Sequence, residues 1–353
     1  MSRFFSRRHA QLKAYVPGEQ PKQRNLIKLN TNESPWPPAP GIGNRVRETA
    51  ERLNLYCDPE AAGLKEKLAG SLEISPEQLI VTNGSDEALD FAFLAFCDEE
   101  HPAVFPDITY GFYPVFARLY HIPFREIPLR EDWRVNPADY DAAGGTIFLA
   151  NPNAPTGLAL SLRDIRGILD RNPDSVVVID EAYVDFGGES ALPLIREYDH
   201  LLVVRTFSKS RGLAGLRLGF AMGQKDLIQD LKTLQYSTNP YNVDRLAQAA
   251  GLACLEEDAV NREHVRQIRE IRAWTAEQLK DMGFEATDSQ ANFLFVRHPA
   301  FPGSALRDRL REKGILIRWF SQERIRDWNR ISIGRKEDME ALTQAVGELL
   351  KEA

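Results

Sequence analysis

Short runs of apolar residues alternate with segments of helical periodicity through the middle of this chain. Five runs are apolar almost throughout: 79–82, 103–105, 146–150, 176–179 and 201–204. Helical patterns follow the first three of them, at 86–97, 113–120 and 162–170. Strands without a polar side are buried on both faces, and a repeated order of strand then helix is typical of a parallel sheet covered by helices. The pattern therefore predicts an α/β fold whose sheet is mainly parallel.

The two ends of the chain have a different sequence pattern. Residues 1–40 are irregular and rich in proline, which predicts an extended arm. A charged helical stretch at 243–282 precedes a last set of strand-like pieces and a final helix; the pieces are 292–296, 315–318 and 330–333. This order predicts a smaller α+β domain. We expect an arm at 1–40 that joins the small domain and the functional site, a large domain at 41–240 and a small domain at 241–353.

Composition narrows the class of protein without fixing its function. The chain has 353 residues, 43% of them hydrophobic and 27% charged, as in ordinary globular proteins of two domains. Its net charge of −7 gives no general attraction to nucleic acid. No apolar stretch approaches the roughly 20 residues of a membrane span, and no secretion signal follows the basic start. Three scattered cysteines read as reduced thiols, and no histidine spacing suggests a metal. We expect a cytoplasmic protein that binds no metal, nucleic acid or membrane.

Polar residues follow the carboxyl ends of four predicted strands. They are the segments 83–86 and 151–153, and the single residues Asp180 and Lys209. Ligands of open parallel sheets bind in the crevice beyond these strand ends. Each cluster alone is weak evidence, but their convergence predicts one site.

Lys209 and Asp180 together suit pyridoxal phosphate. A lysine amine condenses with the aldehyde of this cofactor, and a carboxylate keeps its pyridine nitrogen protonated so that the ring withdraws electrons. Neighbouring arginines would lower the pKa of Lys209, as such an amine requires. Glu181 is an equally good carboxylate by composition, but Asp180 follows the strand directly. Tyr183 either donates to the ring oxygen or packs in the core.

Other residues of these strand ends suit the cofactor phosphate and ring. Gly84, Ser85 and Asp86 lie where a strand turns into a helix, and they either bind a phosphate or simply cap the helix. Further phosphate donors are available downstream: Thr206, Ser208 and Arg217. Tyr110 follows another strand and is placed to stack on the ring.

These motifs resemble a known family. The segment 151–157 (Asn-Pro-Asn-Ala-Pro-Thr-Gly), then 180–183 (Asp-Glu-Ala-Tyr), then Ser208-Lys209 with 215–217 (Gly-Leu-Arg), is similar to the fold-type I pyridoxal-phosphate aminotransferases. Three further segments resemble the histidinol-phosphate aminotransferase branch: 29–35, 240–243 and 330–334. The resemblance runs from about residue 12 to the end of the chain.

The resemblance implies a role for each matching residue. Lys209 would be the Schiff-base lysine, Asp180 would pair with the pyridine nitrogen, Tyr183 would reach the ring oxygen, and Tyr110 would stack on the ring. The phosphate would be surrounded by Gly84, Ser85, Asp86, Thr206, Ser208 and Arg217. Tyr56 would reach the phosphate of a neighbouring subunit, which implies a homodimer with shared sites.

The resemblance also implies how the substrate is held. Arg330 would grip its anionic end, Arg318 would be a second phosphate-binding arginine, and Tyr15 on the arm would close over it. Asn32, in the segment 29–35, is expected among the substrate-binding residues.

One position departs from the family pattern. Family members commonly carry an asparagine immediately before Pro-Thr-Gly, and its amide bonds the cofactor ring oxygen. Here that residue is Ala154, with Asn153 before it. Either Asn153 swings in or Tyr183 holds the oxygen alone.

The implied activity is a ping-pong transamination in histidine biosynthesis. L-Histidinol phosphate would become imidazole-acetol phosphate, and 2-oxoglutarate would take up the amino group as glutamate. An aromatic or broad-range aminotransferase and an L-threonine-O-3-phosphate decarboxylase remain alternatives. A pyridoxal-sensing transcription regulator is disfavoured, because we expect the segment before residue 30 to be too short for a helix-turn-helix module.

Overall fold

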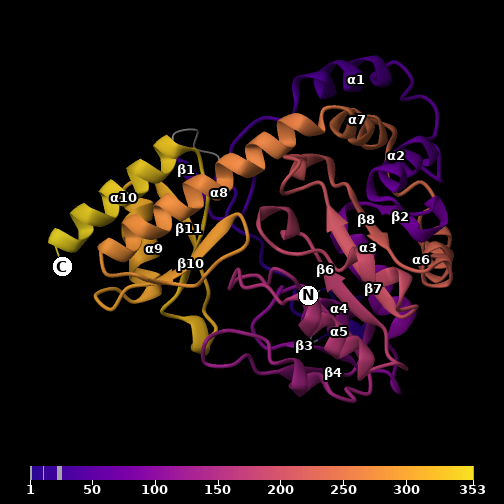
Figure 1. The fold of residues 1–353 in the computed structure, drawn as a ribbon, viewed down its shortest axis with the longest axis horizontal. Helices are drawn as coiled ribbons and strands as arrows, with labels where there is room; N and C mark the ends of the chain where they lie inside the picture. The colour runs from indigo at the N-terminus through magenta and orange to yellow at the C-terminus, as the bar shows by residue number, and fades with distance from the viewer. Residues whose placement is uncertain (1, 11, 22–25, 353) are drawn as a thin grey trace.

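Two β-sheets organise the computed structural model, which describes residues 2–10, 12–21 and 26–352. The larger sheet has seven strands in the order β2-β8-β7-β6-β5-β3-β4, and the smaller has five in the order β1-β11-β12-β10-β9. The long helix α8 (Asp258–Asp281) runs from the side of the larger sheet to the smaller one (Figure 1).

The larger sheet is parallel except for one strand. Its members are β2 (Leu79–Thr82), β3 (Ala103–Pro106), β4 (Phe124–Ile127), β5 (Thr146–Ala150), β6 (Val177–Asp180), β7 (Leu201–Thr206) and β8 (Gly219–Met222). Only β8 is antiparallel to its neighbours, β2 and β7. Together with the structural neighbours described below, this confirms the predicted mainly parallel α/β fold. The short strand β4 and the antiparallel β8 were not predicted.

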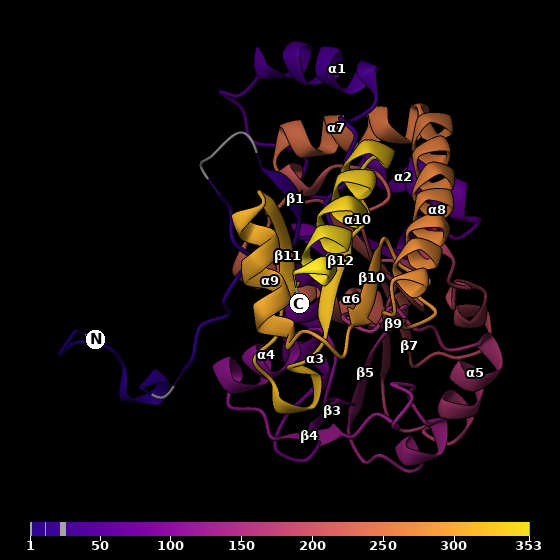
Figure 2. The same ribbon diagram turned by 90° about the vertical axis from the view of Figure 1, so that its left-hand side faces the viewer.

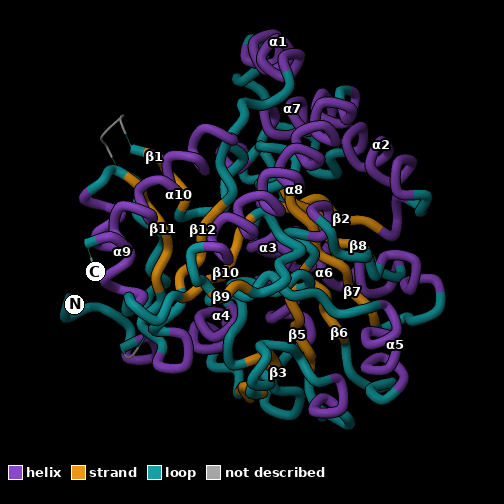
Figure 3. Tube along the Cα trace, turned by 60° about the vertical axis from the view of Figure 1, so that its left-hand side comes forward, coloured by secondary structure: helices purple, strands orange, loops and turns teal. Residues whose placement is uncertain are grey.

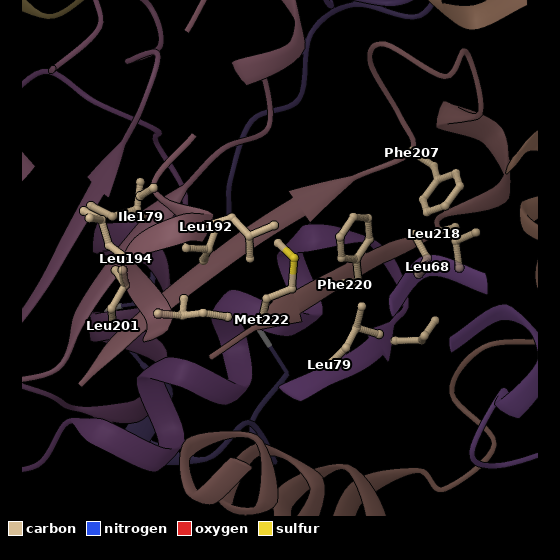
Figure 4. Packing of buried hydrophobic residues seen from close by; sticks show 14 of the residues in the cluster. Leu68, Leu79, Ile179, Leu192, Leu194, Leu201, Phe207, Leu218, Phe220 and Met222 are labelled. Atoms are coloured by element: carbon tan, nitrogen blue, oxygen red, sulfur yellow. The ribbon is translucent and has the colours of Figure 1, made fainter. Parts of the chain in front are cut away.

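Alternate residues of the central strands face two hydrophobic cores, one on each side of the sheet. Ile147 and Leu149 of β5 belong to the first core and Phe148 between them to the second. Both faces are therefore covered, which explains why these runs lack polar residues. Figure 4 shows part of the first core, where Phe220 and Met222 pack among leucines.

Helices cover each face of this sheet. The first core is covered by α2 (Ala62–Leu72), α5 (Leu162–Asp170) and α7 (Arg245–Glu256), and the second by α3 (Gly84–Phe96), α4 (Tyr113–Tyr120) and α6 (Lys225–Thr238). Helix α1 (Pro40–Ala50) packs on α7 at the edge of the molecule (Figure 1). The described residues also contain short 3-10 helices: η1 (Arg7–His9), η2 (Pro76–Gln78), η3 (Pro137–Tyr140), η4 (Val184–Phe186), η5 (Leu192–Arg196), η6 (Ala214–Leu216) and η7 (Glu323–Ile325).

The smaller sheet combines both ends of the chain. Its strands are β1 (Ile27–Leu29), β9 (Glu285–Ala286), β10 (Phe293–Arg297), β11 (Ile315–Trp319) and β12 (Asn329–Ser332). Helices α8, α9 (Gly303–Glu312) and α10 (Lys336–Lys351) pack against it (Figures 2 and 3). The expected arm is thus not irregular throughout, because β1 pairs in parallel with β11. Three residues are too few to show a strand periodicity in the sequence.

The charged helical stretch expected at 243–282 is two helices. The chain leaves helical geometry at Glu257, so α7 ends there and α8 begins. Ala247, Ala250 and Cys254 of α7 belong to the first core of the larger sheet. The structure therefore places the first helix after residue 240 with the larger sheet. Within the part of the chain that the structure describes, no helix is both long and apolar enough to cross a membrane.

Phe148 offers a test of the packing in the second core. Its ring is fully buried and stacks on Phe93 with the centroids 4.1 Å apart. Phe148→Ala should lower the free energy of unfolding by about 3–5 kcal/mol, because it removes buried area and leaves a cavity. Urea unfolding followed by circular dichroism measures this. Phe4→Ala, at an 81% exposed position, is the matched control and should change it by less than about 0.5 kcal/mol. Equal effects of the two substitutions would contradict the packing described.

Candidate active site

A pocket lies at the carboxyl ends of β5, β6 and β7. Its lining residues come from distant parts of the chain: Ser85, Asp86, Tyr110, Ala150, Ala154, Asp180, Ala182, Tyr183, Thr206, Ser208, Lys209 and Arg217. The structure thus brings together most of the residues expected to bind a cofactor. Of that expected set, Gly84, Asn153 and Tyr56 do not line the pocket.

Asp180 is a buried carboxylate at the end of β6. Its oxygens accept hydrogen bonds from the Tyr113 hydroxyl at 3.2 Å and from the Ala182 N–H at 3.1 Å. Burial raises its pKa to about 7, since no cation among the described residues forms an ion pair with it. A ligand that brings a positive charge to this carboxylate, such as a protonated pyridine nitrogen, would remove that cost.

Glu181, the competing carboxylate, faces the other way. It is fully buried and forms an ion pair with Arg205 at 2.9 Å, and it accepts a bond from Ser190 at 2.8 Å. Burial raises the pKa of Glu181, and Arg205 together with these hydrogen bonds offsets part of that cost within the chain. This leaves Asp180 as the carboxylate open to a ligand.

Lys209 follows β7 and points its amine into the pocket. Its Nζ donates to the carbonyl of Thr31 at 3.4 Å and lies 5.7 Å from the centroid of the Tyr183 ring. No ion pair to a carboxylate is formed by this amine within the described chain. The turn is fixed just beyond it, because Ser210 bonds Asp185 and Arg211 pairs with Asp258 of α8 at 2.6 Å.

The start of α3 forms an anion-binding corner of the pocket. The first N–H groups of a helix have no partner within it and carry the positive end of its dipole. The Asn83 side chain does not cap this helix. Gly84 has φ of 76°, and a Cβ there would lie 2.7 Å from a guanidinium nitrogen of Arg217. Glycine is therefore needed for Arg217 to approach the helix terminus.

Arg217 completes this corner together with hydroxyl groups. Its guanidinium donates to Asp86 at 3.0 Å and to the Ser208 hydroxyl at 3.3 Å, and Ser208 in turn bonds Thr206 at 3.0 Å. Tyr110 donates to the other oxygen of Asp86 at 2.7 Å, and burial raises its pKa, so it stays neutral. The Asp86 carboxylate thus orients the arginine and the aromatic ring. The corner suits a phosphate group.

Asn153 does not turn into the pocket. Its amide nitrogen donates to the Ile108 carbonyl and the Thr156 hydroxyl, both at 3.0 Å, and its oxygen accepts from Thr109 at 2.8 Å. The Asn153 side chain therefore stabilises the loop that follows β5, while Ala154 lines the pocket. Of the two possibilities raised by the sequence, this arrangement favours Tyr183 as the group at the ring oxygen.

Arg318 and Arg330 lie side by side on β11 and β12. They are register partners on these antiparallel strands, and no described carboxylate forms an ion pair with either. Arg330 donates to the Asn30 carbonyl at 3.1 Å, its buried Nε has no partner in the described chain, and burial lowers its pKa. Arg318 donates to the Val16 carbonyl at 3.3 Å and lies over the Phe320 ring. Two neighbouring cations without acids form a site for a polyvalent anion.

Three further predicted residues lie around the pocket. Tyr15 packs against Phe112 with the ring centroids 4.3 Å apart and the rings tilted by 31°. Burial raises the pKa of Tyr15, although the charges of the two nearby arginines oppose this. Asn32 is buried, and its amide donates to the Tyr183 hydroxyl at 3.0 Å, so it lies behind that tyrosine rather than open to a substrate. Tyr56 is 78% exposed and stacks on Tyr241.

Two residues near the site were missed from the sequence. Tyr113 is buried and bonds Asp180, and the partly buried Arg205 forms an ion pair with Glu181. Tyr113 begins a predicted helix, and Arg205 directly follows a predicted strand. Nothing local distinguishes such residues, because their partners lie far away in the chain.

The arrangement fits pyridoxal phosphate on observations of this structure alone. One end of the pocket holds a carboxylate that lacks a cation, the other holds an arginine and a helix terminus that suit a phosphate, and the amine of Lys209 lies in the same lining. A pyridine nitrogen, a phosphate and an aldehyde on one small ring match these three features.

The chain is similar over most of its length to known proteins. The family model "Aminotransferase class I and II" matches residues 24–346. Histidinol-phosphate aminotransferases of Chromohalobacter salexigens and Acetobacter pasteurianus are each 48% identical to this chain, over 98% and 99% of it and 99% of each relative. A solved structure of histidinol-phosphate aminotransferase from Sinorhizobium meliloti, in complex with pyridoxal-5'-phosphate, superposes with a TM-score of 0.86 at 26% identity, over 93% of this chain and 92% of that one. The chain belongs to the class I and II aminotransferases and, within them, to the histidinol-phosphate aminotransferase family.

Proposed function

We propose that this pyridoxal-phosphate enzyme transfers the amino group of L-histidinol phosphate to 2-oxoglutarate, giving imidazole-acetol phosphate and glutamate, in histidine biosynthesis. The observation that carries the choice of substrate is the pair Arg318 and Arg330, which has no acidic partner in the described chain. Tyr15 lies close to both arginines and also to Tyr183, which lines the pocket together with Lys209. The relatives named above support the same substrate.

The cofactor, when bound, supplies an aldehyde that links to amines and a ring that withdraws electrons from the substrate Cα. We assign its phosphate to the start of α3, with Ser208, Thr206 and Arg217. Asp180 would hold the proton of the pyridine nitrogen, and Tyr183 would donate to the ring oxygen. Tyr110 would cover one face of the ring, and the hydrogen bond to Asp86 fixes its plane.

Lys209 is the proposed general base. With the cofactor bound, the Nζ of Lys209 would be the group that moves a proton from the substrate Cα. The turn around Lys209 is anchored by Ser210 and Arg211, so the amine stays close to this path. The reverse sequence with 2-oxoglutarate completes the cycle, because arginines accept either a phosphate or a carboxylate.

The assembly and location of the enzyme are part of the proposal. Exposed apolar side chains gather around Tyr56, namely Leu53, Leu55, Tyr236 and Tyr241, and such a patch supports a homodimer in which Tyr56 reaches the partner's site. We propose an arm at 1–40 and large and small domains that meet near residue 257 rather than 240, because α7 packs in the larger core. We also propose a cytoplasmic location, on the sequence grounds given above.

Substrate choice is tested by half-reactions followed through the visible absorption of the bound cofactor. Histidinol phosphate should convert it faster than phenylalanine or phosphothreonine at equal concentration. Arg318→Gln should raise the KM for histidinol phosphate by about tenfold to a hundredfold, as expected for a lost charge-assisted bond, and should affect phenylalanine less. Lys209→Ala is the control and should show no conversion. Faster conversion by phenylalanine, or carbon dioxide release without a keto acid, would contradict the proposal.

Asp180 gives the cofactor-free protein a dependence of stability on pH. Its pKa is 3.8 when unfolded and about 7 when folded, so the folded state loses stability as the pH rises from about 4 to about 7. Three pKa units correspond to on the order of 4 kcal/mol. At about pH 8, cofactor-free Asp180→Asn should therefore unfold at a higher temperature than the wild type.

Adding the cofactor should reverse that order, because a protonated pyridine nitrogen compensates the charge of Asp180 but not an asparagine. Turnover by Asp180→Asn should fall at least about a hundredfold. Thermal unfolding with and without cofactor provides the measurement. A cofactor-free variant less stable than the wild type at this pH would show that Asp180 is not an uncompensated buried carboxylate.

Sharing of Tyr56 between subunits is tested by mixing two inactive variants. If Tyr56→Ala and Lys209→Ala subunits exchange freely, half of the dimers are hybrids, and each hybrid has one site with both residues intact. Activity should therefore recover to about a quarter of the wild-type value. Each variant alone, treated in the same way, is the control. If Tyr56 served its own subunit, mixing would restore nothing.

A further inference from the structure

The pocket lining offers few polar groups on the side assigned to the ring oxygen. Ala154, at the position where the family pattern noted in the sequence has an asparagine, lines the pocket with a methyl group, and the side chain of Asn153 has its hydrogen-bonding groups engaged elsewhere. Among the described lining residues, Tyr183 then offers the hydroxyl on this side. The orientation of its O–H proton decides whether it donates to the cofactor.

The side-chain amide of Asn32 forms a hydrogen bond with the Tyr183 hydroxyl. Its Nδ2 donates to the Tyr183 oxygen at 3.0 Å, and its Oδ1 accepts from the Ser332 hydroxyl at 2.8 Å. Its N–H donates to the same Ser332 oxygen at 2.8 Å, and its carbonyl accepts from Asn292 at 3.0 Å. The residue is 1% exposed with φ of 56°, a backbone region that asparagine tolerates better than most residues. The amide is therefore held in one orientation.

A hydroxyl that accepts a hydrogen bond on one side keeps its own proton for another direction. The amide of Asn32 donates to a lone pair of the Tyr183 hydroxyl oxygen, so the O–H bond of Tyr183 points away from Asn32. Donation to an oxygen also strengthens the bond that the same hydroxyl donates. Two charged groups lie near Tyr183, namely Lys209, whose Nζ is 5.7 Å from the ring centroid, and Arg330. Both are cations and accept no proton from the tyrosine.

We propose that Asn32 is a positioning residue for the cofactor, which acts through Tyr183 by directing its hydroxyl proton to the ring oxygen and so takes the place of the amide missing at Ala154. This rests on the proposed pyridoxal-phosphate function. Because Ser332 lies two residues beyond Arg330 on β12, the same bonds tie the ring oxygen to the strand that holds the substrate anion.

The test is the pH at which the visible absorption of the bound cofactor changes, measured without substrate. A donor to the ring oxygen stabilises its anionic form and keeps this transition at lower pH. Asn32→Ala should move the transition upward by roughly 0.5–1 pH unit, the effect of about one lost hydrogen bond. Adding Ala154→Asn to this variant should move it back, because the amide returns on the other side of the pocket.

Control variants distinguish this positioning role of Asn32 from a purely structural role in the fold. Asn172→Ala removes a buried amide of similar bonding, to Tyr140 and Ile168, far along the chain, and should lower stability without moving the transition. In a Tyr183→Phe background, Asn32→Ala should add no further change. If the alanine variant does not fold, Asn32→Asp keeps the shape and the bond from Ser332 while losing the donor, and should move the transition upward too.

The outcomes distinguish the inference from the function on which it rests. An unmoved transition in the Asn32 variants, no reversal by Ala154→Asn, or an additive change in the Tyr183→Phe background would overturn the role of Asn32 alone. A wild-type protein that takes up no cofactor at Lys209 would instead contradict the proposed function.

Discussion

The site depends on the buried carboxylate of Asp180 at the end of β6, whose negative charge has no ion-pair partner in the described chain. Asp180 is buried, and its partners within the described residues are a tyrosine hydroxyl and one backbone N–H, so its ionised form is costly until a cation binds. The neighbouring Glu181 shows the alternative, since Arg205 compensates it within the chain. One strand end thus carries two acids with opposite tasks. Glu181 is paired within the chain, whereas Asp180 is left with a charge that a cationic ligand would compensate.

The parallel sheet explains why the other groups converge on this carboxylate. The strands that carry Asp180 and Lys209 are neighbours in parallel register, with Asp180 opposite Val204. Their carboxyl ends meet at one edge, and the following turns project side chains into the same crevice. Because β8 is antiparallel to β7, its first residue, Gly219, lies opposite Thr206 at the end of β7, and Arg217 just before it lies at the same edge of the sheet. Gly219 also allows close contact with the start of α3. A phosphate corner therefore forms next to the lysine rather than at a distance from it.

The sequence was sufficient where the signal is local and insufficient where it depends on distant partners. Strands buried on both faces, such as 146–150, show as unbroken apolar runs, and the residues at their ends were predicted with them. The three residues of β1 carry no periodicity, and the break at Glu257 has no glycine or proline to mark it. Asn153 and Asn32 were both expected to face ligands. Their actual partners, Ile108 and Ser332, are 45 and 300 residues away, and no local pattern encodes such a contact.

The segment that follows β1 joins β12 of the smaller sheet to Tyr183 of the pocket through polar bonds. The segment between β1 and α1 carries Asn30 and Asn32, whose carbonyl and side chain bond Arg330 and Ser332 of β12 respectively. A substrate anion that draws Arg330 toward itself pulls on the same segment that orients Tyr183. Packed polar networks of this kind move as units, because each broken bond would leave a buried group unsatisfied. Arg330, Ser332 and Tyr183 are therefore linked by hydrogen bonds to one short segment, residues 30–32.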